Sequence, residues 1–249
     1  MVGALCSLAL APLSRMVFAQ ATDSASEPNA QSIVERADRV RFPAQSFEVE
    51  ITITGTSGGQ PAEMRRYKVL SKGNENTIVQ TTEPASERGQ ALLMRGRDLW
   101  IYMPSVSQPV RLSLSQRLTG QVSNGDLARA NFLGDYNAKM VRTDSAGNER
   151  HHVLELTAAE RGVTYTKVMY WVNAANGHPV RAEFFSVSDR LLKTCRYENF
   201  RTLGGVIRPT RLVLSDALKA GDESIMEYSD MKTRDLPDRM FSKEYLKRL

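Results

Sequence analysis

The stretch Ser46–Gly59, SFEVEITITGTSGG, decides the fold class of this chain. Every second residue from Phe47 to Ile53 is apolar, and the residues between them are Glu or Thr. This period of two places the apolar side chains on one face of a β-strand and the polar ones on the other. The two glycines at its end predict a tight turn, so the next segment returns alongside this strand.

The same pattern continues through most of the chain. Turns rich in Gly, Asn, Asp and Ser separate the segments, and links this short join antiparallel neighbours. We expect further strands at Met64–Ser71, Thr77–Thr81, Arg88–Arg95, Asp98–Met103, Val110–Leu114, Tyr136–Thr143, His151–Thr157, Thr164–Val172, Pro179–Val187, Leu191–Phe200, Val206–Ser215 and Ser224–Met231. A flat sheet of that width would curl or split, so the pattern predicts a mainly β fold, an incomplete antiparallel β-barrel of roughly 11–12 strands.

Four segments depart from the period of two. Ala30–Arg41 carries apolar residues at helical spacing, which predicts one short amphipathic helix. The polar excursion Ser105–Leu133 includes an expected helical piece at Asp126–Phe132, and an insertion of this length in a β-meander is more often functional than idle. Near the end, Pro237–Phe241 is expected to form a turn of helix, followed by KEYLKRL as a charged tail or edge segment.

Length and charge limit the classes of function. The 249 residues, 41% of them hydrophobic, are enough for one domain, which we place at residues 30–249. The net charge of +5 comes from Lys and Arg residues that are dispersed among acidic ones, so we expect no nucleic-acid partner. No stretch approaches the roughly 20 apolar residues that span a bilayer.

The N-terminal segment has the character of an export signal. Residues Met1–Ala21 are mostly small and apolar, although Arg15 interrupts the run, and they end in Ala-Gln-Ala, which fits the pattern cut by signal peptidase. We therefore expect a signal peptide at 1–21, a flexible spacer at 22–29, and a mature protein in the periplasm of a Gram-negative bacterium. Cys195 is then the single remaining cysteine, and we expect it to be a buried small hydrophobic residue.

Motifs for catalysis or metal binding do not stand out. His151 and His152 are adjacent on an expected strand, so their rings point to opposite faces. The pairs Glu48/Glu50 and Glu183/Glu198 could serve a glycosidase, but Glu48 and Glu50 fit a solvated outer face better. We expect no catalytic residue, no cofactor and no metal, although a hydrolase site built from distant residues stays open as an alternative.

A curved sheet with an apolar concave face could instead hold a nonpolar ligand in a dry pocket. The strand Asp98–Met103 is apolar or amphipathic on both faces, which suits a position between a packed layer and a cavity or lid, although an ordinary core strand has the same pattern. The candidate lining residues are Phe47, Val49, Ile51, Ile53, Leu92, Met94, Trp100, Tyr102, Met169, Trp171, Phe184, Met226 and Tyr228. The same set would also describe a well-packed core.

Four segments together resemble the outer-membrane lipoprotein-sorting proteins, the LolA/LolB-like family of periplasmic carriers. They are RGRDLWIYMPSVSQPVRLS, NGDLARANFLGDY, YWVNAANGHPVRAEFFSVSDRLLKTCRYENF and RPTRLVLSDALKAGDESIMEYSDM. The resemblance covers nearly all of the chain after Gln31, and Asp98–Pro104 is its most specific element. It implies an unclosed barrel with a few short helices over its mouth and an apolar interior that receives acyl chains. The residues it adds or supports as ligand-binding are Trp100, Tyr102, Asn131, Phe132 and Asp135.

Two hypotheses follow for function. In the first, the protein is a monomeric carrier that shields the acyl chains of a lipoprotein or lipid and moves them between membranes. Its protein partner could be an inner-membrane RND-type transporter or an outer-membrane acceptor, and the direction of transfer stays open. In the second, suggested by the resemblance to a subgroup linked to RND-type exporters, it is an adaptor that carries nothing. Such an adaptor would dock onto an inner-membrane RND-type transporter through a strand edge or the Ser105–Leu133 insertion.

Overall fold

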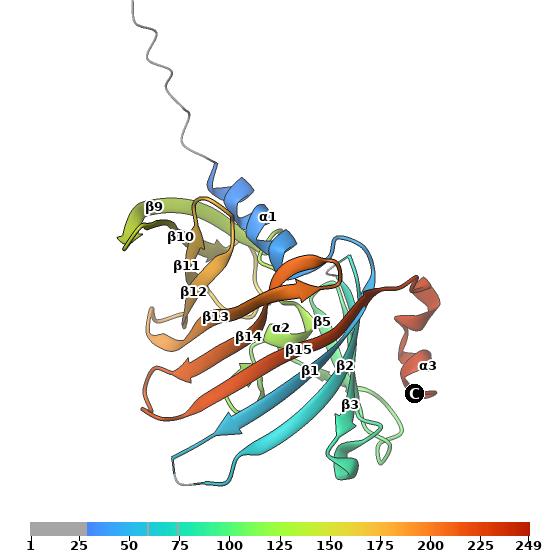
Figure 1. The fold of residues 1–249 in the computed structure, drawn as a ribbon. Coiled ribbons are helices and arrows are strands. Elements are labelled where there is room, and N and C mark those ends of the chain that lie inside the picture. The colour runs from blue at the N-terminus through green and yellow to red at the C-terminus, as the bar shows by residue number, and fades with distance from the viewer. Residues whose placement is uncertain (1–28, 59, 74) are drawn as a thin grey trace, which may run out of the picture.

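The computed structural model describes residues 29–58, 60–73 and 75–249, and in this part of the chain one antiparallel sheet of 13 strands dominates, beside a separate sheet of two short strands, the seventh and eighth along the chain (Figure 1). The strands are β1 Phe47–Thr56, β2 Glu63–Lys72, β3 Asn76–Glu83, β4 Ala91–Arg95, β5 Asp98–Tyr102, β6 Val110–Leu112, β7 Arg117–Thr119, β8 Val122–Ser123, β9 Tyr136–Ala146, β10 Glu149–Ala158, β11 Lys167–Asn173, β12 Pro179–Phe185, β13 Leu191–Leu203, β14 Val206–Asp216 and β15 Glu223–Thr233. The helices are α1 Ala30–Arg41, α2 Asn124–Ala128 and α3 Lys243–Leu246, with single 3-10 turns η1 at Ala85–Glu87 and η2 at Asp238–Met240.

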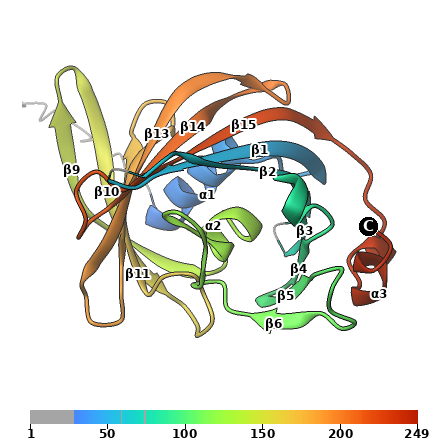
Figure 2. The same ribbon diagram turned by 90° about the horizontal axis from the view of Figure 1, so that it is seen from below.

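The sheet consists of two meanders joined at one seam. The strand order is β6-β5-β4-β3-β2-β1-β15-β14-β13-β12-β11-β10-β9, so β1 pairs with β15 and places Ile51 opposite Tyr228. The first meander runs outward to β6, and the chain then crosses to the far edge and returns from β9. Because β6 and β9 do not pair, the expected half-open barrel is confirmed as a curved, unclosed sheet (Figure 2).

Two helices lie inside the curve of the sheet (Figure 2). Helix α1 has the predicted bounds and begins where the side chain of Asn29 accepts a hydrogen bond from the backbone N–H of Gln31, at 2.8 Å. It buries Ile33, Val34 and Ala37 in the main hydrophobic core. Helix α2, with the short hairpin β7-β8 before it, belongs to the segment that crosses from β6 to β9. The helices therefore lie on the concave side of the sheet, where we expect a ligand site.

The C-terminal segment covers the opposite, convex face. Leu236, Phe241 and Leu246 are buried there in a second apolar cluster with Leu93 of β4. The sequence prediction of a charged tail or edge segment for KEYLKRL was wrong, because Ser242 caps a short helix whose Leu246 anchors it to the sheet. Strands β4 and β5 are consequently apolar on both faces.

Helix α2 also differs from its prediction, since it spans Asn124–Ala128 and not Asp126–Phe132. A capping box formed by Ser123 and Asp126 starts the helix earlier, and Arg129 leaves the helical conformation. The expected signal peptide at 1–21 and nearly all of the expected spacer lie outside the described residues. In the described part of the chain, no helix has both the length and the apolar character needed to cross a membrane.

Candidate functional site

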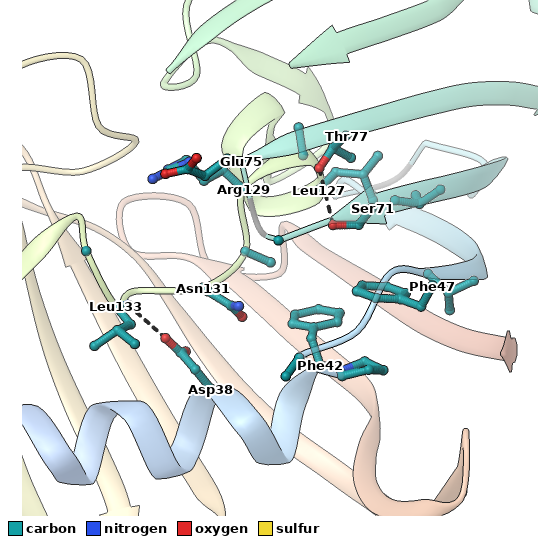
Figure 3. Close-up of a pocket in the computed structure, with 18 of the residues that line it drawn as sticks. Asp38, Phe42, Phe47, Ser71, Glu75, Thr77, Leu127, Arg129, Asn131 and Leu133 are labelled. Carbon is teal, nitrogen blue, oxygen red and sulfur yellow. Dashed lines mark hydrogen bonds between the residues drawn. The ribbon is translucent and has the colours of Figure 1, made fainter. Parts of the chain in front are cut away.

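A cavity of about 640 Å³ lies between the concave face of the sheet and the two interior helices (Figure 3). Apolar side chains of β1, β2 and β15 form its floor. They are Phe47, Val49, Ile51, Val69 and Tyr228. All five are buried. They lie on the same face of the sheet because side chains alternate along β1 and because β1 pairs with β2 and β15. This volume lies in the range of small-molecule sites, which are concave and mostly apolar.

Aromatic packing closes one end of this floor. The ring of Phe42, just after α1, stacks on Phe47 with ring centroids 5.7 Å apart and meets the ring of Tyr228 edge-on at 5.9 Å. Pro43 and Ala44 continue the wall beside them. The link between α1 and β1 is therefore part of the site.

The opposite wall is α2 with the loop that follows it, where Leu127 and Ala128 face the cavity. Helix α2 packs very closely on residue Thr164, since a Cβ added at Gly125 would lie 1.9 Å from the Thr164 hydroxyl. Glycine is required here for close approach, and this contact fixes how far α2 reaches into the curve of the sheet.

Asp38 of α1 connects the helix to the loop after α2. Its Oδ2 accepts hydrogen bonds from the backbone N–H groups of Phe132 and Leu133, both at 2.8 Å (Figure 3). Burial raises the pKa of Asp38 to about 6, against the opposing effects of Arg41 and of these two N–H groups. The guanidinium of Arg41 lies 3.5 Å from Oδ1 and 5.1 Å from the ring centre of Phe132. A charged residue on the buried face of an amphipathic helix thus holds the loop.

A second ion-pair group fastens the same loop to the turn between β4 and β5. Asp135, which is 3% exposed, accepts hydrogen bonds from Arg129 through both oxygens and from Arg97 Nε at 3.1 Å. Arg129 also donates to the carbonyl of Gly96 at 3.1 Å. The bidentate geometry is the strong form of an arginine–carboxylate contact.

A third polar group ties α2 to the second meander. Lys193 of β13, which is 4% exposed, forms an ion pair with Asp126 and donates to the carbonyl of Gln121 at 2.6 Å. The hydroxyl of Tyr165 donates to Asp126 Oδ1 at 2.7 Å. Charged groups this deeply buried are stable only when they are paired and hydrogen-bonded, as they are here. Helix α2 is therefore held from both halves of the sheet.

The structure brings only part of the predicted set to the cavity wall. Phe47, Val49, Ile51 and Tyr228 line it, as does Asn131 from the resemblance. A second group is buried in the same apolar core without lining this cavity. Its members are Ile53, Leu92, Met94, Phe132, Phe184 and Met226. Of these, Phe132, Phe184 and Met226 border a neighbouring hollow of only about 30 Å³.

Four predicted residues lie on the outer face instead. Trp100 and Tyr102 pack against the C-terminal cluster, because the alternation of β5 points Leu99 and Ile101 inward. Met169 and Trp171 likewise alternate with buried core residues of β11. These four do not line the cavity.

The environment of Trp171 shows why an aromatic residue can lie on that outer face. Its indole N–H donates to Asp144 Oδ2 at 3.0 Å, and the guanidinium of Arg181 lies 4.9 Å from its ring centre. These contacts give a large side chain partners on the solvent side.

Several functional candidates were missed from the sequence. Asp38, Phe42, Leu127 and Arg129 all line the cavity. Asp38 had a detectable signal, since it lies on the same helical face as Val34 and Ala37, where a carboxylate is out of place. The positions of the others depend on contacts with distant segments.

Within residues 29–58, 60–73 and 75–249, no three His, Cys, Asp or Glu side chains gather so that they could hold a metal ion. Cys195 is buried in the core as expected, and burial raises the pKa of its thiol to about 12, which keeps it protonated and unreactive.

Comparisons with known proteins place this architecture among solved structures. A family model described as "-like: Uncharacterized protein" matches residues 73–248. The crystal structure of a LolA superfamily protein from Nitrosomonas europaea is 61% identical in sequence, has a TM-score of 0.84, and the match covers 87% of this chain and 98% of that one. No curated protein matches the chain.

Two more distant structures share the fold. A DUF1329 family protein from Desulfovibrio piger has 21% identity and a TM-score of 0.75, with 87% of this chain and 97% of that chain covered. A protein domain from Vibrio parahaemolyticus described as outer membrane lipoprotein-sorting has 20% identity and a TM-score of 0.74, with 88% and 98% covered. At these identities, the two likenesses support the fold alone.

Proposed function

The chain belongs to the LolA superfamily, and from this premise we propose that it is a carrier, not an enzyme. In this role it binds acyl chains of a lipoprotein or lipid in the cavity between β1, β2 and the interior helices, and it moves them between membranes without covalent chemistry. The signal peptide expected at Met1–Ala21 would place it in the periplasm.

The cavity with its apolar floor is the observation that carries this proposal. Burying each methylene group of a ligand contributes about 0.8 kcal/mol, so an alkyl chain lying on Phe47, Val49 and Ile51 gains binding energy in proportion to its length. The polar contacts of Asp38 and Asp135 hold the covering loop in place and leave the floor itself apolar. Such a site favours apolar ligands and discriminates little between alkyl chains of different structure.

The test fills the cavity from its helical wall. Ala128 is 4% exposed and faces the cavity, so Ala128→Phe should occupy space that an alkyl chain would use. We expect uptake of a fluorescent fatty acid to fall at least about tenfold, which corresponds to displacing roughly two buried methylene groups. The matched control is Ala159→Phe at an exposed position, which should bind as the unmodified protein does.

Native mass spectrometry of protein purified from its own periplasm completes the test. Lipid that remains bound to the unmodified protein and is lost from Ala128→Phe supports the carrier. Protein that is always empty and takes up no fatty acid, with both variants folded, would contradict it.

The adaptor hypothesis retains one supporting observation. Strand β9 is an 11-residue edge of the sheet, with several exposed residues along it, and such an edge can pair with a strand of another protein. An adaptor would keep its partner in a pull-down when Ala128→Phe blocks the cavity. Fatty-acid uptake by the unmodified protein that Ala128→Phe abolishes would favour the carrier, whereas a partner retained by a protein that takes up no fatty acid in either form would favour the adaptor.

A further inference from the structure

Two buried oxygen atoms at the wall of the cavity lack a hydrogen-bond partner among the described residues. They are Oδ1 of Asp38, in a side chain that is 4% exposed, and Oδ1 of Asn131. Both residues line the cavity, one from α1 and the other from the loop after α2 (Figure 3). Leaving a buried acceptor unpaired costs about 1–3 kcal/mol, so a partner supplied by a ligand would be favourable.

Arg41 does not take the place of that partner. Its Nη1 lies 3.5 Å from Asp38 Oδ1, beyond the usual range of a hydrogen bond, and that nitrogen is also without a hydrogen-bond partner in the described residues. The guanidinium carbon lies 5.1 to 5.4 Å from the ring centres of Phe42, Phe132 and Tyr197, which surround it. The charge of Asp38 is therefore balanced nearby, while its Oδ1 still lacks a donor.

The two free atoms are both acceptors, and the floor of the cavity is apolar. The matching ligand is an amphiphile that lays an alkyl body on Val49 and Ile51 and directs a hydrogen-bond donor toward Asp38 and Asn131. A carboxylate head group offers no donor and would bring a second negative charge to Asp38. Since the positive charge of Arg41 already balances the negative charge of Asp38, a neutral hydrogen-bond donor fits the site better than a cation does.

We propose that this cavity selects amphiphiles with a hydroxyl group at the polar end, which donates to Asp38 Oδ1 or Asn131 Oδ1. This selectivity rests on the proposed carrier function and narrows its cargo from acyl chains in general to hydroxyl-bearing lipids.

The test uses displacement of the fluorescent apolar probe N-phenylnaphthylamine by chain-matched competitors at neutral pH. Dodecanol should displace the probe at concentrations about three- to tenfold lower than its methyl ether, which keeps the oxygen but has no donor, because one hydrogen bond has that net strength. Dodecanol should also compete better than dodecanoate or dodecylamine.

Two variants locate the selectivity. Asp38→Asn replaces the free acceptor with an amide group and should reduce the preference for the alcohol over the ether. Asn131→Leu keeps the size of the side chain and removes the other free acceptor, so it serves as a second variant should Asp38→Asn fold poorly. Loss of the preference in either folded variant supports the inference.

The possible outcomes separate the inference from the function on which it rests. If the probe binds and all competitors displace it equally well, the selectivity is overturned and the carrier stands. If dodecylamine competes best, the site prefers a cation and the hydroxyl assignment is overturned. If neither the probe nor any competitor binds to the folded protein, the carrier function fails together with the inference.

Discussion

At the residue scale, Glu48 shows how the outer face of β1 is stabilised by charge. Its carboxylate is 5% exposed and lies 2.9 Å from Lys232 and 3.6 Å from Lys68, with Arg234 also in contact. Burial opposes the charged form, but the hydrogen bonds from Lys232 and Arg234 and the nearby Lys68 lower the pKa of Glu48 to about 2. These cations join β1 to its two neighbours in the sheet.

A pH-dependent loss of stability should follow from this site. Because the folded pKa lies below the unfolded value, Glu48 stabilises the fold above pH 4.5, and the contribution is lost as the pH falls from 4.5 toward 2. We expect Glu48→Gln to lower the free energy of unfolding by about 1–2 kcal/mol at pH 7, since the cations are partly solvated. Urea unfolding should show a smaller difference at pH 3.

Glu50→Gln is the matched control, since Glu50 occupies the next position on the same face of β1. It should shift stability much less at pH 7. An equal loss in both variants, or a Glu48→Gln difference that persists unchanged at pH 3, would show that the cation cluster is not the cause.

Trp100 was predicted to bind ligand, but the structure places it in the packing of the convex face. Its ring lies 4.3 Å from Lys243 Nζ, in the cluster that holds the C-terminal helix on the convex face. We expect Trp100→Ala to lower stability by about 2 kcal/mol, less than a fully buried position would, and to leave fatty-acid uptake unchanged. Phe47→Ala, in the cavity floor, should instead reduce uptake. Uptake lost in Trp100→Ala at normal stability would reassign Trp100 to ligand binding.

At the scale of elements, the loop after α2 depends on buried ion pairs more than on secondary structure. Asp135 pairs with Arg129 and Arg97, and Asp38 holds the backbone of the same loop. Removing one partner of a buried pair leaves a charge uncompensated and typically costs about 3–5 kcal/mol. The loop should therefore respond as a unit to a change at Asp135.

Asp135→Asn should open this loop locally. We expect faster hydrogen exchange at the amides of Phe132 and Leu133, with much smaller changes in the central strands. Glu160→Gln is the control, because Glu160 pairs with the same Arg97 but is 68% exposed. Equal exchange in the two variants would mean that Asp135 does not fasten the loop.

At the scale of the whole molecule, local patterns predicted the strands but not which two strands join the two meanders into one sheet. Helix α1 and the alternation of β1 follow from short-range periodicity and were correctly predicted. The pairing of β1 with β15 joins residues more than 160 positions apart, and nothing local specifies it. The face of β5 was equally hidden, because its outer cover comes from the C-terminal segment. The cavity wall depends on such long-range contacts, so only its β1 and β15 side chains were anticipated from the strand pattern, and Asn131 from the family resemblance.

The seam between β1 and β15 also governs how the molecule should unfold. Ile53 is 1% exposed and lies opposite Met226 across the seam, in a core shared by both meanders and by α1. If the sheet is one cooperative unit, Ile53→Ala should destabilise both meanders together, by about 2–5 kcal/mol, with one unfolding transition. Hydrogen exchange should then show the greatest protection in β1 and β15 and the least in the edge strands β6 and β9. Two separate transitions, with β9–β14 still protected after β1–β5 have exchanged, would show instead that the meanders fold independently.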